Sequence, residues 1–249
     1  MLSKKQIIKN LRKIKITENF IIIHSDITGL FFKNFSIEEL WKMIFLSLGK
    51  DKTYIMPTFN LTNKKKVWKS LSSKSETGIL SEYFRKKIAL KRTIHPLHSV
   101  SIFGKNINKI KIKNSASSFG KGSIWEWICT SKDVCNLSFG LRLNGGATFC
   151  HYSEEIMRVN YREYIDLKIK VFNNKNKLQK KKFTYFGRKK NIFNDWNRCE
   201  KDLYQNQLIK KYVFSENKYI ISKMNTQKVT NFIINKLKKD NNYLIKKFT

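Results

Sequence analysis

A histidine followed closely by two glutamates is the most chemically suggestive feature of the sequence. It lies in "GGATFCHYSEE", residues 145–155, where His151 precedes Glu154 and Glu155 by three and four positions. On a helix these spacings place the three side chains on one face. A carboxylate there can accept a hydrogen bond from one ring nitrogen, which fixes the tautomer and raises the basicity of the other nitrogen. The pattern therefore fits a general base.

Two other interpretations of His151 stay open on spacing alone. A zinc site normally shows ligands at motif spacing, such as H-E-x-x-H, and this segment holds a single histidine. A metal would therefore require His24 or His98 to converge on it. Alternatively, the histidine begins a helix whose glutamates face water, as ordinary helix polarity. The residues themselves do not decide among a base, a ligand and a surface group.

Other segments offer polar groups at expected strand ends and loops, where open α/β sheets bind ligands. The four histidines all lie at such positions: His24, His95, His98 and His151. The glycines before Thr148 permit close backbone approach to a ligand. The loop "FGKGS" at 119–123 can cradle a phosphate, although it lacks the ending of a Walker motif. Ser25 has no G-x-S-x-G elbow around it, so a nucleophilic serine is not indicated.

The elements expected to position these groups alternate between helices and strands. Hydrophobic periodicity predicts helices at 4–15, 36–49, 78–88, 151–163 and 226–240, and a short one within 117–128. Compact apolar runs predict strands at 19–25, 52–60 and 133–144, with another following a loop in 92–104. The polar segment 60–76 indicates a loop or flap. This order predicts an α/β fold, a single-domain three-layer sandwich whose central sheet is mostly parallel or mixed and is flanked by helices.

Composition narrows the class of protein. The 249 residues are 41% hydrophobic and 13% aromatic, enough for a substantial core. The sequence has four cysteines, Cys129, Cys135, Cys150 and Cys199, and no two of them form a C-x-x-C motif. Neither a zinc ribbon nor a disulfide framework is therefore indicated. The sequence has no apolar run long enough for a signal peptide or a membrane span, so we expect a cytoplasmic protein.

The formal net charge of +33 has two competing explanations. Such an excess is typical of proteins with polyanionic partners. However, lysine far outnumbers arginine and the basic residues are dispersed along the chain, as compositional drift would leave them. A basic nucleic-acid-binding protein is one candidate function. It is disfavoured because no zinc-finger, RNP or basic-zipper pattern is present. The sequence does not indicate an oligomeric state.

Six segments, in order, resemble the aminoglycoside 3-N-acetyltransferases, a family of antibiotic N-acetyltransferases. They are "IIIHSDITGL", "IMPTFN", "TGILSEYFRKK", "RTIHPLHSVSIFG", "SSFGKGSIWEWI" and "GGATFCHYSEEIMRVNYR". The resemblance implies one acetyltransferase domain over residues 1–249, with its core motifs at 19–165 and a more divergent polar part at 166–249. It also implies acetyl-CoA as co-substrate, no metal, and an amino sugar as acceptor. A family member that has lost activity is a further possibility, against which the retained motif residues argue.

The resemblance assigns roles to particular residues. The family's H-x-x-E motif falls on His151 and Glu154, which implies a general base and its orienting carboxylate. The family threonine three residues before the histidine matches Thr148. The family's H-S-S-L loop matches His24 and Ser25, with Asp26 where a second serine is usual. The positions implied to bind CoA are His24, Ser25, Thr28, His98, Ser99 and Ser123.

The implied chemistry is direct attack of an amine on a thioester. The base must take a proton from the amine, and the thioester oxygen needs hydrogen-bond donors as it becomes negative. Candidate donors are the backbone N–H groups of residues 24–29 and the hydroxyl of Thr148. No covalent acyl-enzyme is required, so Ser25 need not be a nucleophile.

Net charge bears on the acceptor. A protein at +33 repels polycationic aminoglycosides, whereas it attracts the phosphates of CoA or of a nucleotide-linked amino sugar. We therefore expect an amino-sugar precursor of a bacterial cell-surface polysaccharide. A local acidic patch formed by Glu76, Glu82 or Asp26 would instead favour an antibiotic acceptor.

Overall fold

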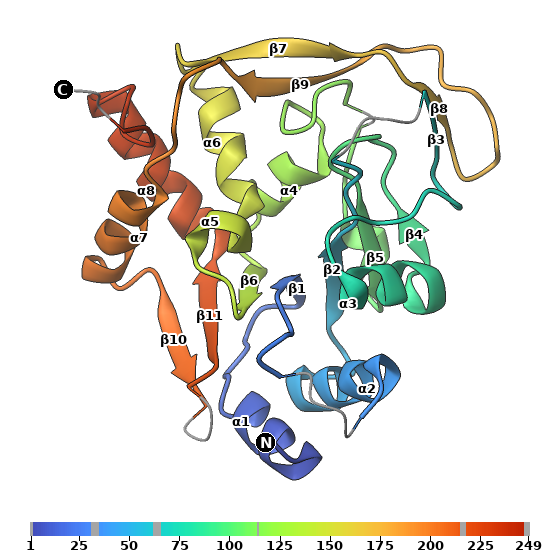
Figure 1. Cartoon of the computed structure of the whole chain (residues 1–249), viewed down its shortest axis with the longest axis vertical. Coiled ribbons are helices and arrows are strands. Elements are labelled where there is room, and N and C mark those ends of the chain that lie inside the picture. The colour runs from blue at the N-terminus through green and yellow to red at the C-terminus, as the bar shows by residue number, and fades with distance from the viewer. Residues whose placement is uncertain (1, 31–34, 62–65, 114, 215–217, 247–249) are drawn as a thin grey trace.

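The computed structural model describes residues 2–30, 35–61, 66–113, 115–214 and 218–246, and its centre is a seven-stranded sheet (Figure 1). In chain order its strands are β1 (Phe20–Ser25), β2 (Thr53–Pro57), β4 (Lys91–Arg92), β5 (Val100–Gly104), β6 (Val134–Phe139), β10 (Lys210–Val213) and β11 (Ile220–Asn225). Their spatial order is β10-β11-β6-β1-β2-β5-β4. Of the neighbouring pairs in this sheet, β6–β1 and β1–β2 are parallel and the other four are antiparallel. The sheet is therefore mixed, one of the two predicted forms.

Side chains of the central strand β1 alternate between two cores, as the two-residue period of a strand requires. Ile22 packs in a cluster with helices α4 (Ile124–Thr130), α7 (Trp196–Gln205) and α8 (Thr226–Lys239). Ile21 and Ile23 pack in a second cluster with α1 (Lys4–Arg12), α2 (Ile37–Leu48) and α3 (Ile79–Tyr83). The predicted three-layer α/β arrangement is thus confirmed, with helices on both faces of the sheet (Figure 1).

Local signals fix several helix starts. The predicted capping box begins α2: the Ser36 hydroxyl accepts the Glu39 backbone N–H, and the Glu39 carboxylate accepts the Ser36 N–H. Each such pair satisfies two backbone donors that a helix end leaves free. The C-terminal helix α8 starts after its cap Asn225 and buries one apolar stripe. The polar C-terminal part therefore contributes β10, β11, α7 and α8 to the same sheet and core.

Two small sheets lie outside the central one. Strand β3 (Val67–Lys69) pairs parallel with β8 (Lys170–Phe172), and β7 (Arg162–Leu167) pairs antiparallel with β9 (Phe183–Arg188). The expectation of a loop or flap over 60–76 is therefore wrong at 67–69, and its residues 62–65 lie outside the described ones. The helix expected at 78–88 consists of α3 and a π-helical turn, Phe84–Ile88.

The helix predicted over 151–163 is shorter than expected. Helix α6 (His151–Ile156) ends because Arg158 takes a left-handed backbone conformation, with φ of 46°. The N–H groups of Arg158 and Val159 then close the helix by donating to the carbonyls of Glu155 and Glu154, at 3.1 and 3.2 Å. The chain turns back, which brings the start of β7 beside the side chain of Glu154.

The four cysteines are buried free thiols. Among the described residues, no helix is both long and apolar enough to cross a bilayer.

Candidate active site

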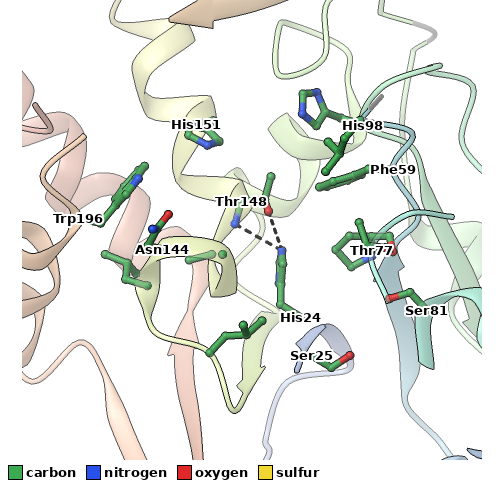
Figure 2. A pocket seen from close by; sticks show the side chains of 16 residues that line it. His24, Ser25, Phe59, Thr77, Ser81, His98, Asn144, Thr148, His151 and Trp196 are labelled. Carbon is green, nitrogen blue, oxygen red and sulfur yellow. Dashed lines mark hydrogen bonds between the residues drawn. The ribbon is translucent and has the colours of Figure 1, made fainter. Parts of the chain in front are cut away.

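A cavity of about 410 Å³ lies at the carboxyl ends of β1 and β2 (Figure 2). The segment that precedes α6 forms one wall through α5 (Leu143–Gly146) and a 3-10 turn (Thr148–Cys150), and α6 begins at His151. Five of the residues assigned from the sequence line this cavity: His24, Ser25, His98, Thr148 and His151. The sheet topology thus brings together polar groups that are more than 100 positions apart.

His151 and Glu154 form the hydrogen-bonded pair that the H-x-x-E spacing predicts. The ring nitrogen Nδ1 lies 2.5 Å from Glu154 Oε2, and the Glu154 side chain is fully buried while that of His151 is 27% exposed. A carboxylate only accepts, so Nδ1 carries the hydrogen, and in the neutral ring Nε2 keeps its lone pair. Arg162 Nη2 also lies 3.2 Å from Nδ1. No described residue hydrogen-bonds Nε2.

Two residues that had no predicted role hold Glu154 in place. The Tyr161 hydroxyl donates to Oε1 at 3.0 Å, and Arg162 Nε forms an ion pair with the same oxygen at 2.8 Å. Arg162 also donates from Nη1 to the carbonyl of Phe186. Burial alone would raise the pKa of Glu154, but the adjacent His151 and Arg162 hold that pKa below its ordinary value. Glu154 is therefore an ionised, fully partnered carboxylate.

His24 belongs to a second, buried network. Its Nδ1 lies 2.8 Å from Asn136 Oδ1, and its Nε2 lies 3.0 Å from Thr148 Oγ1. Burial lowers the pKa of His24 to about 4, so the ring is neutral at physiological pH. Asn136 stands in the middle of β6, on the strand that pairs with β1.

His98 and His95 are both buried, and burial lowers the pKa of each. His98 lines the cavity and its Nδ1 lies 2.8 Å from Ser118 Oγ. His95 has a structural role: its Nδ1 accepts the backbone N–H groups of Leu97 and His98, and its Nε2 contacts the carbonyl of Thr184.

Three of the predicted CoA-binding residues do not line this cavity. Thr28 donates its backbone N–H and hydroxyl to Asp26, and so shapes the loop after β1. Ser99, which directly precedes β5, is fully buried, and its hydroxyl donates to the Thr58 carbonyl. Ser123 caps α4 by accepting the Glu126 N–H. Their role in binding CoA stays a prediction.

Four residues of the site had no predicted role: Asn136, Tyr161, Arg162 and Trp196. Trp196 lines the cavity from the start of α7, with its ring centroid 5.4 Å from that of His151 in an edge-on arrangement. Asn136 carried a signal, since an amide inside an apolar strand needs a partner. Within the described residues, no three His, Cys, Asp or Glu side chains are grouped so as to hold a metal ion.

Residues 22–238 match the family model of aminoglycoside 3-N-acetyltransferases, and the chain belongs to this family. It is therefore a CoA-dependent N-acetyltransferase, with acetyl-CoA as co-substrate and an amino group as acceptor. No curated protein matches the chain in sequence.

Solved structures with the same fold are distant in sequence. The YokD protein from Bacillus subtilis is 14% identical, with a TM-score of 0.77 over 96% of this chain and 100% of that chain. The aminoglycoside acetyltransferase AAC(3)-IVa apoenzyme is 17% identical, with a TM-score of 0.75 over 97% and 90%. AAC-IIIb in a binary complex with CoASH is 12% identical, with a TM-score of 0.77 over 96% and 97%.

The cavity suits the arm of acetyl-CoA that carries the thioester. That arm combines amides with methylene groups, and the cavity lining combines hydroxyl and apolar side chains, namely Ser25, Thr77 and Ser81 with Pro57, Phe59 and Leu61. Ser25, at the end of β1, has no hydrogen-bond partner for its hydroxyl among the described residues, so the group is available to a ligand.

Proposed function

We propose that His151 is the general base that takes a proton from the attacking amine, with Glu154 as its orienting carboxylate. The observation that carries this proposal is the geometry of the pair. Glu154 engages Nδ1 at 2.5 Å and leaves Nε2 unpaired in the cavity wall. The ionised carboxylate also stabilises the imidazolium that forms when Nε2 accepts a proton.

Bound acetyl-CoA supplies an acetyl thioester, and the residues of the chain supply position and proton transfer. Tyr161 and Arg162 hold Glu154, and Glu154 holds the ring of His151. Trp196 packs edge-on against that ring and limits its rotation. A base positioned in this way typically contributes ~10²–10⁴-fold to the rate.

The test is His151→Ala, with release of the CoA thiol as the assay. We expect the rate of acetyl transfer to fall by at least ~10²-fold. CoA should still raise the melting temperature, because the variant removes no predicted CoA contact. The control is Lys201→Ala, which changes an exposed side chain of α7 that does not line the cavity and should leave the rate unchanged. Near-normal turnover of His151→Ala would exclude this base.

We further propose that the acceptor is an amino sugar carried on a nucleoside diphosphate rather than a polycationic aminoglycoside. Of the described residues that line the cavity, none is Asp or Glu. Polycation sites gather carboxylates, because opposite charge steers encounter and offsets desolvation. The described lining holds no Lys or Arg either, so the attraction of a diphosphate rests on the net charge of +33 of the whole chain.

The three carboxylates considered for an acidic patch are engaged elsewhere. Glu76 accepts the Leu61 N–H at 2.7 Å, Glu82 forms a 2.7 Å ion pair with Arg85, and Asp26 accepts from Thr28. None of the three lines the cavity. A relative, AAC(3)-IVa, has been solved in complex with apramycin and with a gentamicin. Antibiotics of this kind are therefore the natural comparison.

A panel of acceptors separates these classes. CoA release is measured with apramycin, gentamicin and sugars that carry a free amine on a nucleoside diphosphate, such as UDP-glucosamine. We expect kcat/KM to be highest for a nucleotide-linked acceptor, and to fall with added salt as its attraction is screened. A higher kcat/KM for apramycin would overturn this acceptor class. Both proposed substrates are metabolites of the cytoplasm, so the cytoplasmic location forms part of the proposal.

A further inference from the structure

The buried amide of Asn136 has only one possible orientation. Its Nδ2 lies 2.9 Å from the carbonyl oxygen of Gly146, which can only accept a hydrogen bond. The Ser138 hydroxyl donates to the same carbonyl at 2.5 Å, so Ser138 Oγ accepts from Nδ2 as well, at 2.9 Å. The other amide atom, Oδ1, therefore faces His24.

This orientation fixes the tautomer of His24. Asn136 Oδ1 accepts a hydrogen bond from Nδ1 at 2.8 Å, so Nδ1 carries the hydrogen. The ring is buried and neutral, and its Nε2 therefore presents a lone pair. Two groups of Thr148 face that lone pair, the hydroxyl at 3.0 Å and the backbone N–H at 3.4 Å.

The hydroxyl of Thr148 must then donate its hydrogen to His24. A hydroxyl has one hydrogen and two lone pairs. Among the described residues His24 is the only hydrogen-bond partner of Thr148 Oγ1, so the lone pairs are left for the cavity that Thr148 lines. Thr148 consequently presents an acceptor to the cavity, and the earlier expectation that its hydroxyl donates to the thioester oxygen does not fit this network.

We propose that Asn136 and His24 are positioning residues that make Thr148 a hydrogen-bond acceptor for the attacking amine. The inference rests on the proposed function of His151. A neutral primary amine has two hydrogens and one lone pair. Thr148 Oγ1 holds one hydrogen and His151 Nε2 receives the other, so the lone pair is left to face the thioester carbon. The two residues lie three positions apart in the same wall of the cavity (Figure 2).

A nucleophilic role for Thr148 fits the same contacts less well. The order Thr148, His24 and Asn136 matches a nucleophile, a base and an orienting group. Such a base must become an imidazolium, and here it is buried, with a pKa lowered to about 4 and a neutral amide as its partner. The network therefore orients the hydroxyl without ionising it.

The inference predicts selectivity for the number of hydrogens on the acceptor. A secondary amine has one N–H, so it cannot satisfy His151 and Thr148 together. We compare the best acceptor of the panel above with its N-methyl derivative. For the wild type we expect kcat/KM to be lower by ~10-fold or more for the N-methyl derivative. This is the contribution of one hydrogen bond to an amine that becomes positively charged during the attack. Thr148→Val removes the second acceptor, and the difference should fall to about threefold or less.

Two further readouts separate this role from a structural one. Thr148→Val should raise KM for the acceptor ~10-fold and leave KM for acetyl-CoA within about threefold, while Thr148→Ser restores most of the loss. Unchanged selectivity with a raised KM for acetyl-CoA would place Thr148 on the thioester and overturn the inference. An acetyl group found on Thr148 by mass spectrometry would overturn it too.

The chain of hydrogen bonds from Asn136 through His24 to Thr148, here called the relay, is tested without any substrate. Nitrogen-15 NMR of the imidazoles should show His24 as the neutral tautomer with hydrogen on Nδ1 at pH 7. A hydrogen on Nε2 would overturn the relay and leave the assignment of His151 as base intact. Conversely, normal turnover of His151→Ala would remove the proposed function and leave the tautomer of His24 unchanged.

Discussion

Replacing Glu154 with glutamine should reverse the tautomer of His151 at almost constant shape. The carboxylate now accepts from His151 on one oxygen and from Tyr161 and Arg162 on the other. A glutamine must place its NH2 group on one of these two sides. If the NH2 group faced Arg162 Nε, two hydrogen-bond donors would face each other. The amide oxygen of the glutamine therefore faces Arg162, and its NH2 group faces His151 Nδ1. That nitrogen then accepts, and the hydrogen moves to Nε2.

A histidine with hydrogen on Nε2 cannot take a proton from the amine at that atom. The equivalent carboxylate-to-amide change in a serine protease triad costs ~10⁴-fold, so we expect kcat of Glu154→Gln to fall by ~10³–10⁴-fold. That loss corresponds to about 4–5.5 kcal/mol of transition-state stabilisation. The variant also leaves Arg162, with a side chain only 10% exposed, without its counter-charge. Breaking such a pair costs ~3–5 kcal/mol of folding free energy.

Stability and chemistry must therefore be measured together. The assay is thiol release at a temperature where circular dichroism shows the variant folded, alongside nitrogen-15 NMR of His151. The matched control is Glu155→Gln, because Glu155 is the adjacent buried glutamate and contacts Ser117 and the Phe119 N–H instead of His151. A folded Glu154→Gln enzyme within about tenfold of the wild-type kcat would refute the tautomer argument.

Three further predictions concern the surroundings of single side chains. Ser25→Ala should keep measurable activity, because no described base contacts that hydroxyl, and a trapped acetyl-serine would contradict direct transfer. Burial lowers the pKa of His24 and His95 from 6.5 to about 4, so the unfolded chain binds more protons between these pH values. The free energy of unfolding is therefore full above about pH 6.5 and should fall by about 3 kcal/mol per histidine as the pH drops to about 4; urea midpoints that do not change with pH would disprove this. Burial raises the pKa of all four cysteine thiols, which belong to Cys129, Cys135, Cys150 and Cys199. A thiol reagent should therefore label them only in denaturant, and rapid labelling of the native protein would contradict this.

The parts of the site that the sequence predicts are those fixed by local spacing. His151 and Glu154 lie on one short helix, so their contact follows from helical geometry. The capping box of α2 is local in the same way. By contrast, Asn136 reaches His24 across 112 positions, and only the register of β1 against β6 brings them together.

The wrong prediction for the helix after His151 comes from geometry that the sequence does not display. Helical periodicity predicts that Arg162 lies on the helix that begins at His151. The left-handed residue Arg158 ends this helix early, so the chain turns back and Arg162 contacts Glu154. Ser99 directly follows His98, yet its hydroxyl donates to the Thr58 carbonyl and does not line the cavity, so its contact with CoA stays a prediction. Proximity in a motif therefore does not fix the direction of a side chain.

His151 and His24, two of the three histidines that line the cavity, show what separates a base from a positioning residue in this protein. Both carry their hydrogen on Nδ1, and in both an oxygen of a neighbouring side chain accepts it. For His151 that oxygen belongs to an ionised carboxylate, which stabilises the charge of an imidazolium. For His24 it belongs to the neutral amide of Asn136, so a buried imidazolium there would have no counter-charge. The same tautomer therefore lets His151 accept a proton and confines His24 to holding the hydroxyl of Thr148.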